Sequence, residues 1–361
     1  MTDTGDRVYH LADDLDGLTV VASLKELNVD RSWGQVKKWL AQRRVLVNGN
    51  LCLDEARRVQ GGDVIKLLEN PHAKPVDVAD IRLAHWDEHL LVVEKPAGIT
   101  SVRHKAEKDL SARRKQLQPT LEELLPRVLA KVLRISWPPP PPKGLNRGRI
   151  QGKGKHRFTN SVVANPKWLP PELQIMPVHR LDRDTSGLMI FARSNAAKSG
   201  LIQMFRRHRI ERQYIAVCHG TIEPCKLESY LVRDRGDGRR GSAVVEDDQA
   251  PEGALKAVTH LLTAEPIGSG DVSYSKLRLR LETGRTHQIR IHLSEVGNPI
   301  CGDGLYFPGA IASQSRDQSG APRQALHSDT LKFTHPVTGQ QLDFTMALPR
   351  DLAGWLNRLA K

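Results

Sequence analysis

Charged residues give way to an apolar run in the stretch His179-Arg180-Leu181-Asp182-Arg183-Asp184-Thr185-Ser186-Gly187-Leu188-Met189-Ile190-Phe191-Ala192. This order predicts a loop that leads into a buried strand, with residues 185–187 as the turn. Because a buried strand is rigid, the loop in front of it can hold a side chain in a fixed position. We expect that side chain to be Asp182, since Arg180 and Arg183 flank it and keep its carboxylate ionised. An ionised carboxylate can act as a nucleophile or as a base.

The same residues would also suit an ordinary surface loop of ion pairs beside a strand. The ten residues from His179 to Leu188, however, resemble the signature of the RluA-type RNA pseudouridine synthases. In that family the aspartate after Arg-Leu is catalytic, so the resemblance assigns this role to Asp182. It also implies that His179, Arg180 and Arg183 bind substrate. Arg180 could fill the gap that a flipped nucleotide leaves in its stack.

The composition indicates a basic protein of two domains. The chain has 361 residues, enough for about two domains, and a net charge of +13. Such an excess favours a polyanionic partner, nucleic acid before membrane, although a merely basic soluble protein is the alternative. There is no apolar run of membrane-spanning length, no signal-peptide pattern and no Cys-x-x-Cys pair. We therefore expect a cytoplasmic monomer without a membrane partner, a disulfide framework or a zinc site.

The N-terminal region contains a candidate RNA-binding domain. Residues 1–15 are polar and are expected to form a flexible leader. Within residues 16–70, a helix expected to begin near Asp30 precedes Val45-Leu46-Val47-Asn48-Gly49 and Gly62-Asp63-Val64-Ile65. These pieces resemble the S-four-type RNA-binding domain, a small α/β domain named for a ribosomal protein, whereas a helical cap on the main domain is the alternative. The expected RNA contacts are Arg31, Lys37, Lys38, Arg43 and Arg44.

Residues 71–361 form the expected catalytic domain. An apolar run at residues 90–93 ends in Lys95-Pro96-Ala97-Gly98, which resembles the first block of the family and predicts a sharp exit from a strand. A plain strand-ending turn is the alternative, but the resemblance makes Lys95 a candidate substrate contact. Residues 134–170 hold a polyproline run and a glycine-rich basic arm, expected to be an insertion that orders on RNA or a solvated loop without a role. Its candidate RNA contacts are Arg147, Arg149, Lys153, Lys155 and Arg157.

Two later segments complete the expected site. Tyr214 stands in an apolar strand where the family has a tyrosine that stacks on the target base, although such a residue is more often part of the core. Residues 282–293 resemble the family block Thr-Gly-Arg-x-His-Gln-Ile-Arg-x-His, in which the last arginine pairs with the catalytic aspartate. The resemblance therefore assigns Arg290 this role, because a planar guanidinium can hold a carboxylate by two bonds.

The same block supplies further candidates and a helix. Thr286 is the expected N-cap and Gly297 the expected stop. Arg285, His287 and Gln288 are candidate substrate contacts, while a basic helix end that touches phosphate is the alternative interpretation. His287 and His292 are five residues apart, which does not suit a helical metal pair, so we assign no metal.

The resemblance implies an α+β pseudouridine synthase fold on a mixed, mainly antiparallel sheet. It also implies the isomerisation of uridine to pseudouridine in RNA without a cofactor, by covalent attack or by proton abstraction at Asp182. Large-subunit rRNA is the expected partner and tRNA the alternative. Two other functions compete with this one: an inactive RNA-binding or ribosome-assembly factor, and a nucleoside or glycoside hydrolase. The hydrolase would need two carboxylates, and Asp184 is the nearby second candidate.

Overall fold

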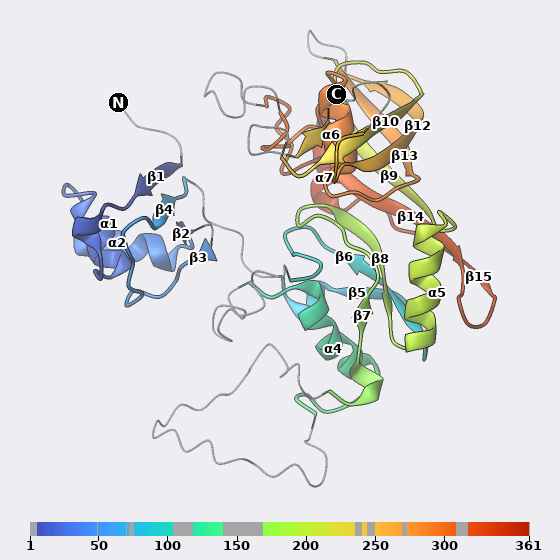
Figure 1. Cartoon of the computed structure of the whole chain (residues 1–361), viewed down its shortest axis with the longest axis horizontal. Helices are drawn as coiled ribbons and strands as arrows, with labels where there is room; N and C mark the ends of the chain where they lie inside the picture. The colour runs from blue at the N-terminus through green and yellow to red at the C-terminus, as the bar shows by residue number, and fades with distance from the viewer. Residues whose placement is uncertain are drawn as a thin grey trace. The chain divides into compact units, whose positions relative to one another are not determined.

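The computed structural model describes residues 6–48, 50–69, 71, 76–103, 118–139, 169–234, 240–243, 250–268, 273–307 and 317–360. The chain divides into two compact units, a smaller one built largely from residues 1–75 and a larger one that begins at Val76 (Figure 1). Most of the expected insertion lies outside the described residues, including Arg147, Arg149, Lys153, Lys155 and Arg157.

The smaller unit contains a four-stranded antiparallel sheet and two helices. The sheet has the strand order β1 (Arg7–His10), β4 (Val64–Leu67), β2 (Val45–Val47), β3 (Asn50–Leu51), and the helices are α1 (Val20–Glu26) and α2 (Trp33–Ala41). Leu24 of α1, Leu40 of α2 and Ile65 of β4 belong to one buried core. The expectation of a loose leader up to residue 15 is wrong from Arg7 onward. Strand β1 is only four residues long, too short to give a clear periodicity, and its pairing with β4 forms it.

Helix α2 begins two residues later than its sequence suggested. Ser32, and not Asp30, is the N-cap, because Ser32 and Gln35 form a capping box. The Ser32 hydroxyl accepts the Gln35 N–H at 3.2 Å, and the Gln35 side chain accepts the Ser32 N–H at 2.8 Å. Two backbone donors at the helix start are thereby satisfied.

The larger unit is built on an eleven-stranded mixed sheet, as predicted. Nine strands follow the order β11-β10-β12-β13-β9-β14-β8-β6-β5, with β15 paired to β14 and β7 paired to β8. All described strand pairs are antiparallel except β14 with β8. The strands are β5 (Arg82–Trp86), β6 (Leu90–Lys95), β7 (Met176–Pro177), β8 (Ser186–Ala192), β9 (Glu211–His219), β10 (Cys225–Val232), β11 (Gly241–Ser242), β12 (Leu255–Ile267), β13 (Tyr274–Leu281), β14 (Leu326–Thr334) and β15 (Gln341–Thr345). The helices are α4 (Leu121–Val132), α5 (Asn195–Arg206), α6 (Gln288–Glu295) and α7 (Arg350–Leu359), with short 3-10 turns at Asp13–Leu15 in the smaller unit and at Val78–Asp80 and Pro171–Leu173 in the larger one.

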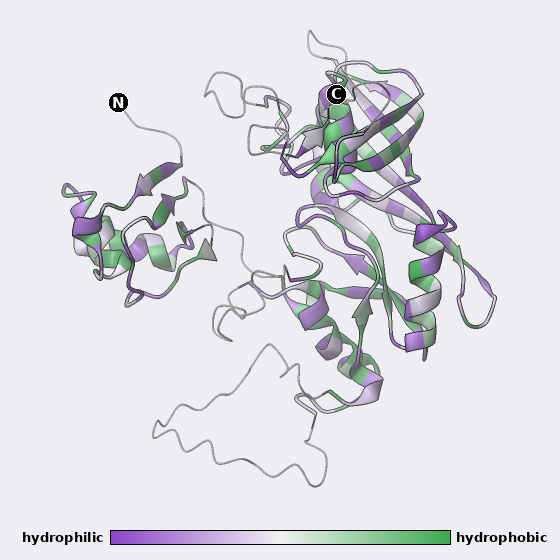
Figure 2. Cartoon of the chain, in the orientation of Figure 1, coloured by the Kyte–Doolittle hydropathy of each residue, from purple (hydrophilic) through white to green (hydrophobic). Residues whose placement is uncertain are grey.

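Helices cover both faces of the sheet at β6 and β8. Leu91 and Val93 point into the core that contains α4, whereas Leu90 and Val92 pack with α5 on the opposite face. Because successive side chains in a strand point to opposite faces, a strand covered on both sides reads as a continuous apolar run. Every residue of β8 is buried accordingly, and Figure 2 shows apolar and polar residues interspersed around both helices. This rigid centre carries the loop of residues 179–185.

Among the described residues, no helix combines the length and the apolar character that crossing a bilayer requires.

Candidate active site

A cavity of about 420 Å³ opens beside the loop that precedes β8. Asp182, Tyr214 and Arg290 all line it, although they come from the loop, from β9 and from α6. Among the described residues that line the cavity, Asp182 carries the only carboxylate. The guanidinium groups of the lining are those of Arg180, Arg206, Arg212, Arg285 and Arg290. A single acid in a basic hollow suits a polyanionic ligand.

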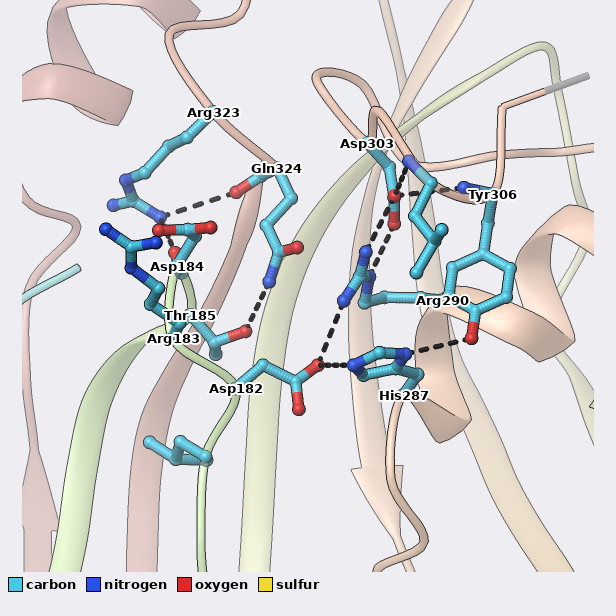
Figure 3. A network of polar contacts seen from close by, with 12 residues as sticks. Asp182, Arg183, Asp184, Thr185, His287, Arg290, Asp303, Tyr306, Arg323 and Gln324 are labelled. Atoms are coloured by element: carbon cyan, nitrogen blue, oxygen red, sulfur yellow. Dashed lines mark hydrogen bonds and ion pairs between the residues drawn. The ribbon is translucent and has the colours of Figure 1, made fainter. Parts of the chain in front are cut away.

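Arg290 connects Asp182 to a second aspartate, Asp303 (Figure 3). Its Nη1 lies 3.3 Å from Asp182 Oδ2, while its Nε and Nη2 donate to the Asp303 carboxylate at 2.6 and 2.8 Å. Burial alone would raise the pKa of Asp303, but the hydrogen bonds and the charge of Arg290 lower it below its usual value. The two-bond contact with Asp303 fixes the guanidinium, so that one remaining N–H is directed at Asp182.

His287 lies beside the same carboxylate oxygen of Asp182 as Arg290, and its other ring nitrogen contacts Tyr306 (Figure 3). His287 Nε2 lies 3.9 Å from Asp182 Oδ2, and His287 Nδ1 is 2.8 Å from the Tyr306 hydroxyl. His287 has a left-handed φ of 61° and is itself the N-cap of α6, so the expectation that Thr286 caps this helix is wrong. Burial lowers the pKa of His287 despite the nearby Asp182, and the imidazole is therefore neutral at pH 7.

Tyr214 forms part of the cavity wall with only 4% of its surface exposed. Burial raises the pKa of its phenol, so the free enzyme holds it protonated at neutral pH. Because Tyr214 and Asp182 line the same cavity, the tyrosine can contact a nucleobase that enters it.

Lys95 bonds the backbone of the loop that carries Asp182. It is fully buried and does not line the cavity, and its Nζ donates to the carbonyls of Pro96 at 3.1 Å, Arg183 at 2.9 Å and Thr185 at 2.7 Å. Burial lowers the pKa of Lys95 to about 7. The expectation that Lys95 contacts substrate is therefore replaced by a positioning role.

Replacing Lys95 by methionine should destabilise the protein and slow its reaction. The carbonyls of Pro96 and Thr185 would lose the Lys95 amine, and the Arg183 carbonyl would keep the Gly98 N–H. Each buried, unsatisfied polar group costs about 1–3 kcal/mol. We expect a clear fall in the melting temperature of Lys95→Met, while the exposed Lys131→Met on α4 should melt like the wild type. Equal melting temperatures for Lys95→Met and the wild type would contradict this role.

Other contacts fix the same loop. The Ser101 hydroxyl donates to the Leu181 carbonyl at 2.6 Å, and Gln324 Nε2 donates to Thr185 Oγ1 at 2.7 Å. Arg323 Nη1 donates to the Asp184 carbonyl at 2.9 Å, whereas the Asp184 carboxylate is exposed and does not line the cavity. Of the two carboxylates in this loop, only that of Asp182 therefore lines the cavity.

Three further candidates have structural partners. Gln288 is buried, and its amide bonds the Val258 carbonyl, Thr259 Oγ1, Thr283 Oγ1 and the Arg285 N–H. His179 Nε2 accepts the Ile190 N–H at 2.8 Å, and burial lowers the pKa of His179 to about 3. His179 is thus a neutral part of the wall. Arg183 does not line the cavity, and its Nε donates to the Gly98 carbonyl at 3.3 Å.

Arg180 and Arg285 are exposed and connect the cavity to a second hollow of about 840 Å³. Arg233 and Arg240 add positive charge to its lining, which also contains Asp234 and Glu252. The two hollows share Gly284 and Thr286 as well, so they form adjoining parts of one basic surface.

The basic residues of the smaller unit differ in their accessibility. Lys38 is exposed. Arg31 and Lys37 form surface ion pairs with Asp30 at 3.1 Å and Glu55 at 2.9 Å, which are weak enough for a phosphate to replace. Arg44 Nε donates to the Leu68 carbonyl at 2.7 Å, and Arg43 adopts a left-handed φ of 61° before β2.

Asp303, Tyr306 and Arg212 are parts of the site that the sequence analysis did not identify. The segment of residues 299–303 resembles a family block, which predicted a structural part at the sheet edge. Nothing local to that segment indicates that Asp303 pairs with Arg290, which lies in another element. Arg212 could have been found, since it lies two residues before Tyr214 on the same strand and so on the same face.

Comparisons with known proteins identify the family of this chain. The family model described as RNA pseudouridylate synthase matches residues 142–295, and the S4 domain model matches residues 20–65. Ribosomal large subunit pseudouridine synthase D of Zymomonas mobilis subsp. mobilis is 32% identical over 311 residues, covering 84% of this chain and 81% of the relative. The protein of the same name from Vibrio parahaemolyticus serotype O3:K6 is 28% identical over 352 residues, covering 94% and 90%.

The fold has a counterpart among solved structures. Human RNA pseudouridylate synthase domain containing 4 aligns with a TM-score of 0.51 and 20% identity over 77% of this chain and 92% of that one. This similarity shows that the mixed sheet of the larger unit has the fold of that structure. This chain belongs to the RluA-type RNA pseudouridine synthases and carries an N-terminal S4 domain. It is therefore an isomerase, as its sequence predicted.

Proposed function

We propose that this enzyme converts specific uridines of large-subunit ribosomal RNA to pseudouridine, with Asp182 as the catalytic residue. The observation that carries the proposal is the isolation of Asp182, which is the only carboxylate among the described lining residues and is held by Arg290 at 3.3 Å. The relatives named as ribosomal large subunit pseudouridine synthases support the choice of RNA.

The isomerisation breaks one bond to the ribose and forms another, and each step defines what the residues of the site would have to do. The bond between the uracil nitrogen and the ribose breaks, the uracil turns, and a ring carbon forms the new bond to the same ribose carbon while losing its proton. All atoms except the exchanged proton stay in the RNA, so the isomerisation needs no cofactor. Asp182 would attack the sugar or take a proton from it, Arg290 would orient Asp182, and Tyr214 would stack on the uracil.

A hydrolase is less compatible with the site. Glycoside hydrolysis usually uses two carboxylates on opposite sides of the bond. The Asp184 carboxylate is exposed and outside the cavity lining, and Asp303 is bound on both oxygens by Arg290. The described lining therefore lacks the second acid.

Mapping of pseudouridine in a strain that lacks this protein tests the proposal. Reverse-transcription stops after carbodiimide treatment should be missing at one or a few uridines of large-subunit rRNA, and a plasmid with the wild-type sequence should restore them. Loss of stops in tRNA alone would transfer the activity to tRNA. An unchanged pattern in both RNAs would contradict the proposed function.

A further inference from the structure

Arg212 is a second cation deep in the cavity, and the roles proposed above do not use it. It lies on β9, two residues before Tyr214, and both side chains line the cavity. Only 7% of Arg212 is exposed, and its guanidinium carbon lies 5.3 Å from the centre of the Phe205 ring. This stacking holds the guanidinium plane in one orientation.

Within the described residues, no carboxylate pairs with Arg212. Its Nη2 makes one long hydrogen bond, 3.3 Å to the Glu282 carbonyl, and its Nε is buried without a partner. Arg290 differs in this respect, because Asp303 neutralises it through two short bonds. A buried cation without a counter-ion lowers the stability of the folded protein, so its presence indicates that an anion occupies the cavity at some stage.

The backbone opposite Arg212 is shaped to leave the guanidinium uncovered. Gly284 lines the same cavity, and a Cβ at this position would lie 2.7 Å from Arg212 Nη1. The φ of Gly284 is not left-handed, so space, and not backbone conformation, explains the glycine. A side chain at position 284 would therefore displace Arg212 Nη1 from its place in the cavity wall.

We propose that Arg212 binds a phosphate group attached to the ribose of the target uridine, on its 5′ or its 3′ side. This inference rests on the proposed function, because it takes the ligand of the cavity to be RNA. Uracil is neutral and cannot compensate the charge, whereas a phosphate oxygen pair matches the planar fork of a guanidinium. A phosphate held at Arg212 would anchor the ribose beside Asp182 while the uracil is free to turn.

Binding of modified RNA tests this assignment. The probe is a synthetic stem-loop around a uridine found by the mapping. In two versions a neutral methylphosphonate replaces the phosphate on the 5′ or the 3′ side of that uridine. All versions, including the one with normal phosphates, carry the same 2′-O-methyl group. We expect one of the two replacements to weaken binding to the wild type about tenfold, the value of one charged hydrogen-bonded contact. Arg212→Met should bind the unmodified strand about tenfold more weakly and show no further loss with that methylphosphonate.

The controls separate binding from folding. Arg209→Met, an exposed arginine outside the cavity lining, should respond like the wild type. Arg212→Met should melt at the same temperature as the wild type or higher without RNA, because it removes an uncompensated charge; a residue with only a structural role would lower it. Arg212→Lys keeps the charge without the fork and should retain part of the response, which gives a result if the methionine variant does not fold.

Two failures are distinguishable. If the wild type restores no pseudouridine to the large-subunit rRNA of the deletion strain, the proposed function is wrong. If it forms pseudouridine, but Arg212→Met and the wild type lose the same affinity with each methylphosphonate, the assignment to Arg212 alone is wrong.

Discussion

Asp182→Asn should form no detectable pseudouridine while its affinity for RNA stays within a few fold of the wild type. The amide preserves the size of the side chain but supplies neither a nucleophile nor a base. Asp182 is mostly buried and is held by Arg290. Because the described cavity lining contains no other carboxylate, no neighbouring acid can take its place. Turnover is measured on rRNA from the deletion strain, and affinity by filter binding on the same RNA.

A matched control is available two residues away. Asp184 is exposed and outside the cavity lining, and Asp184→Asn should keep near wild-type turnover. Comparable activity in Asp182→Asn and the wild type would end the proposed role of Asp182. Loss of activity in both variants to the same degree would point to general damage of the loop.

Asp303→Ala should lose both stability and activity. Arg290 would lose its two-bond partner and keep the 3.3 Å contact with Asp182. Breaking a buried ion pair typically costs about 3–5 kcal/mol. Arg290 would then be free to shift from its present orientation, and misplacement of a catalytic group by about 1 Å can reduce the rate about 100-fold. The free energy of unfolding in urea and the rate at saturating RNA check the two effects.

The control for this variant is an exposed ion pair. Asp343 pairs with Lys332 at 2.8 Å on the surface, and Asp343→Ala should change stability by less than about 1 kcal/mol with unchanged turnover. An Asp303→Ala protein as stable and as active as Asp343→Ala would show that Asp303 does not hold Arg290 in place.

Much of the fold could be predicted because local pattern and burial agree in it. The apolar runs of β8 and β6 are visible in the sequence, and both are buried strands in the structure. The family resemblance also singled out Asp182, Tyr214 and Arg290 in three separate segments. The comparisons confirm the family resemblance, whereas the roles of these three residues stay predictions.

The remainder depends on contacts between distant segments. The role of Asp303 becomes visible only through its contact with Arg290. Lys95 supports the loop because the Arg183 and Thr185 carbonyls accept hydrogen bonds from its amine. The N-cap of α6 is the left-handed His287 and not Thr286, and the ring of His287 lies beside Asp182 and Tyr306. The partners of these contacts are 13 or more residues apart, so local sequence patterns do not reveal them.

Release of tritium from uridine labelled at the ring carbon that becomes bonded to the ribose tests the central claim most directly. With labelled rRNA from the deletion strain, the wild type should release tritium to water without releasing free uracil, and Asp182→Asn should release neither. Tritium release by Asp182→Asn at the wild-type rate, or free uracil from the wild type, would contradict an isomerisation that depends on Asp182.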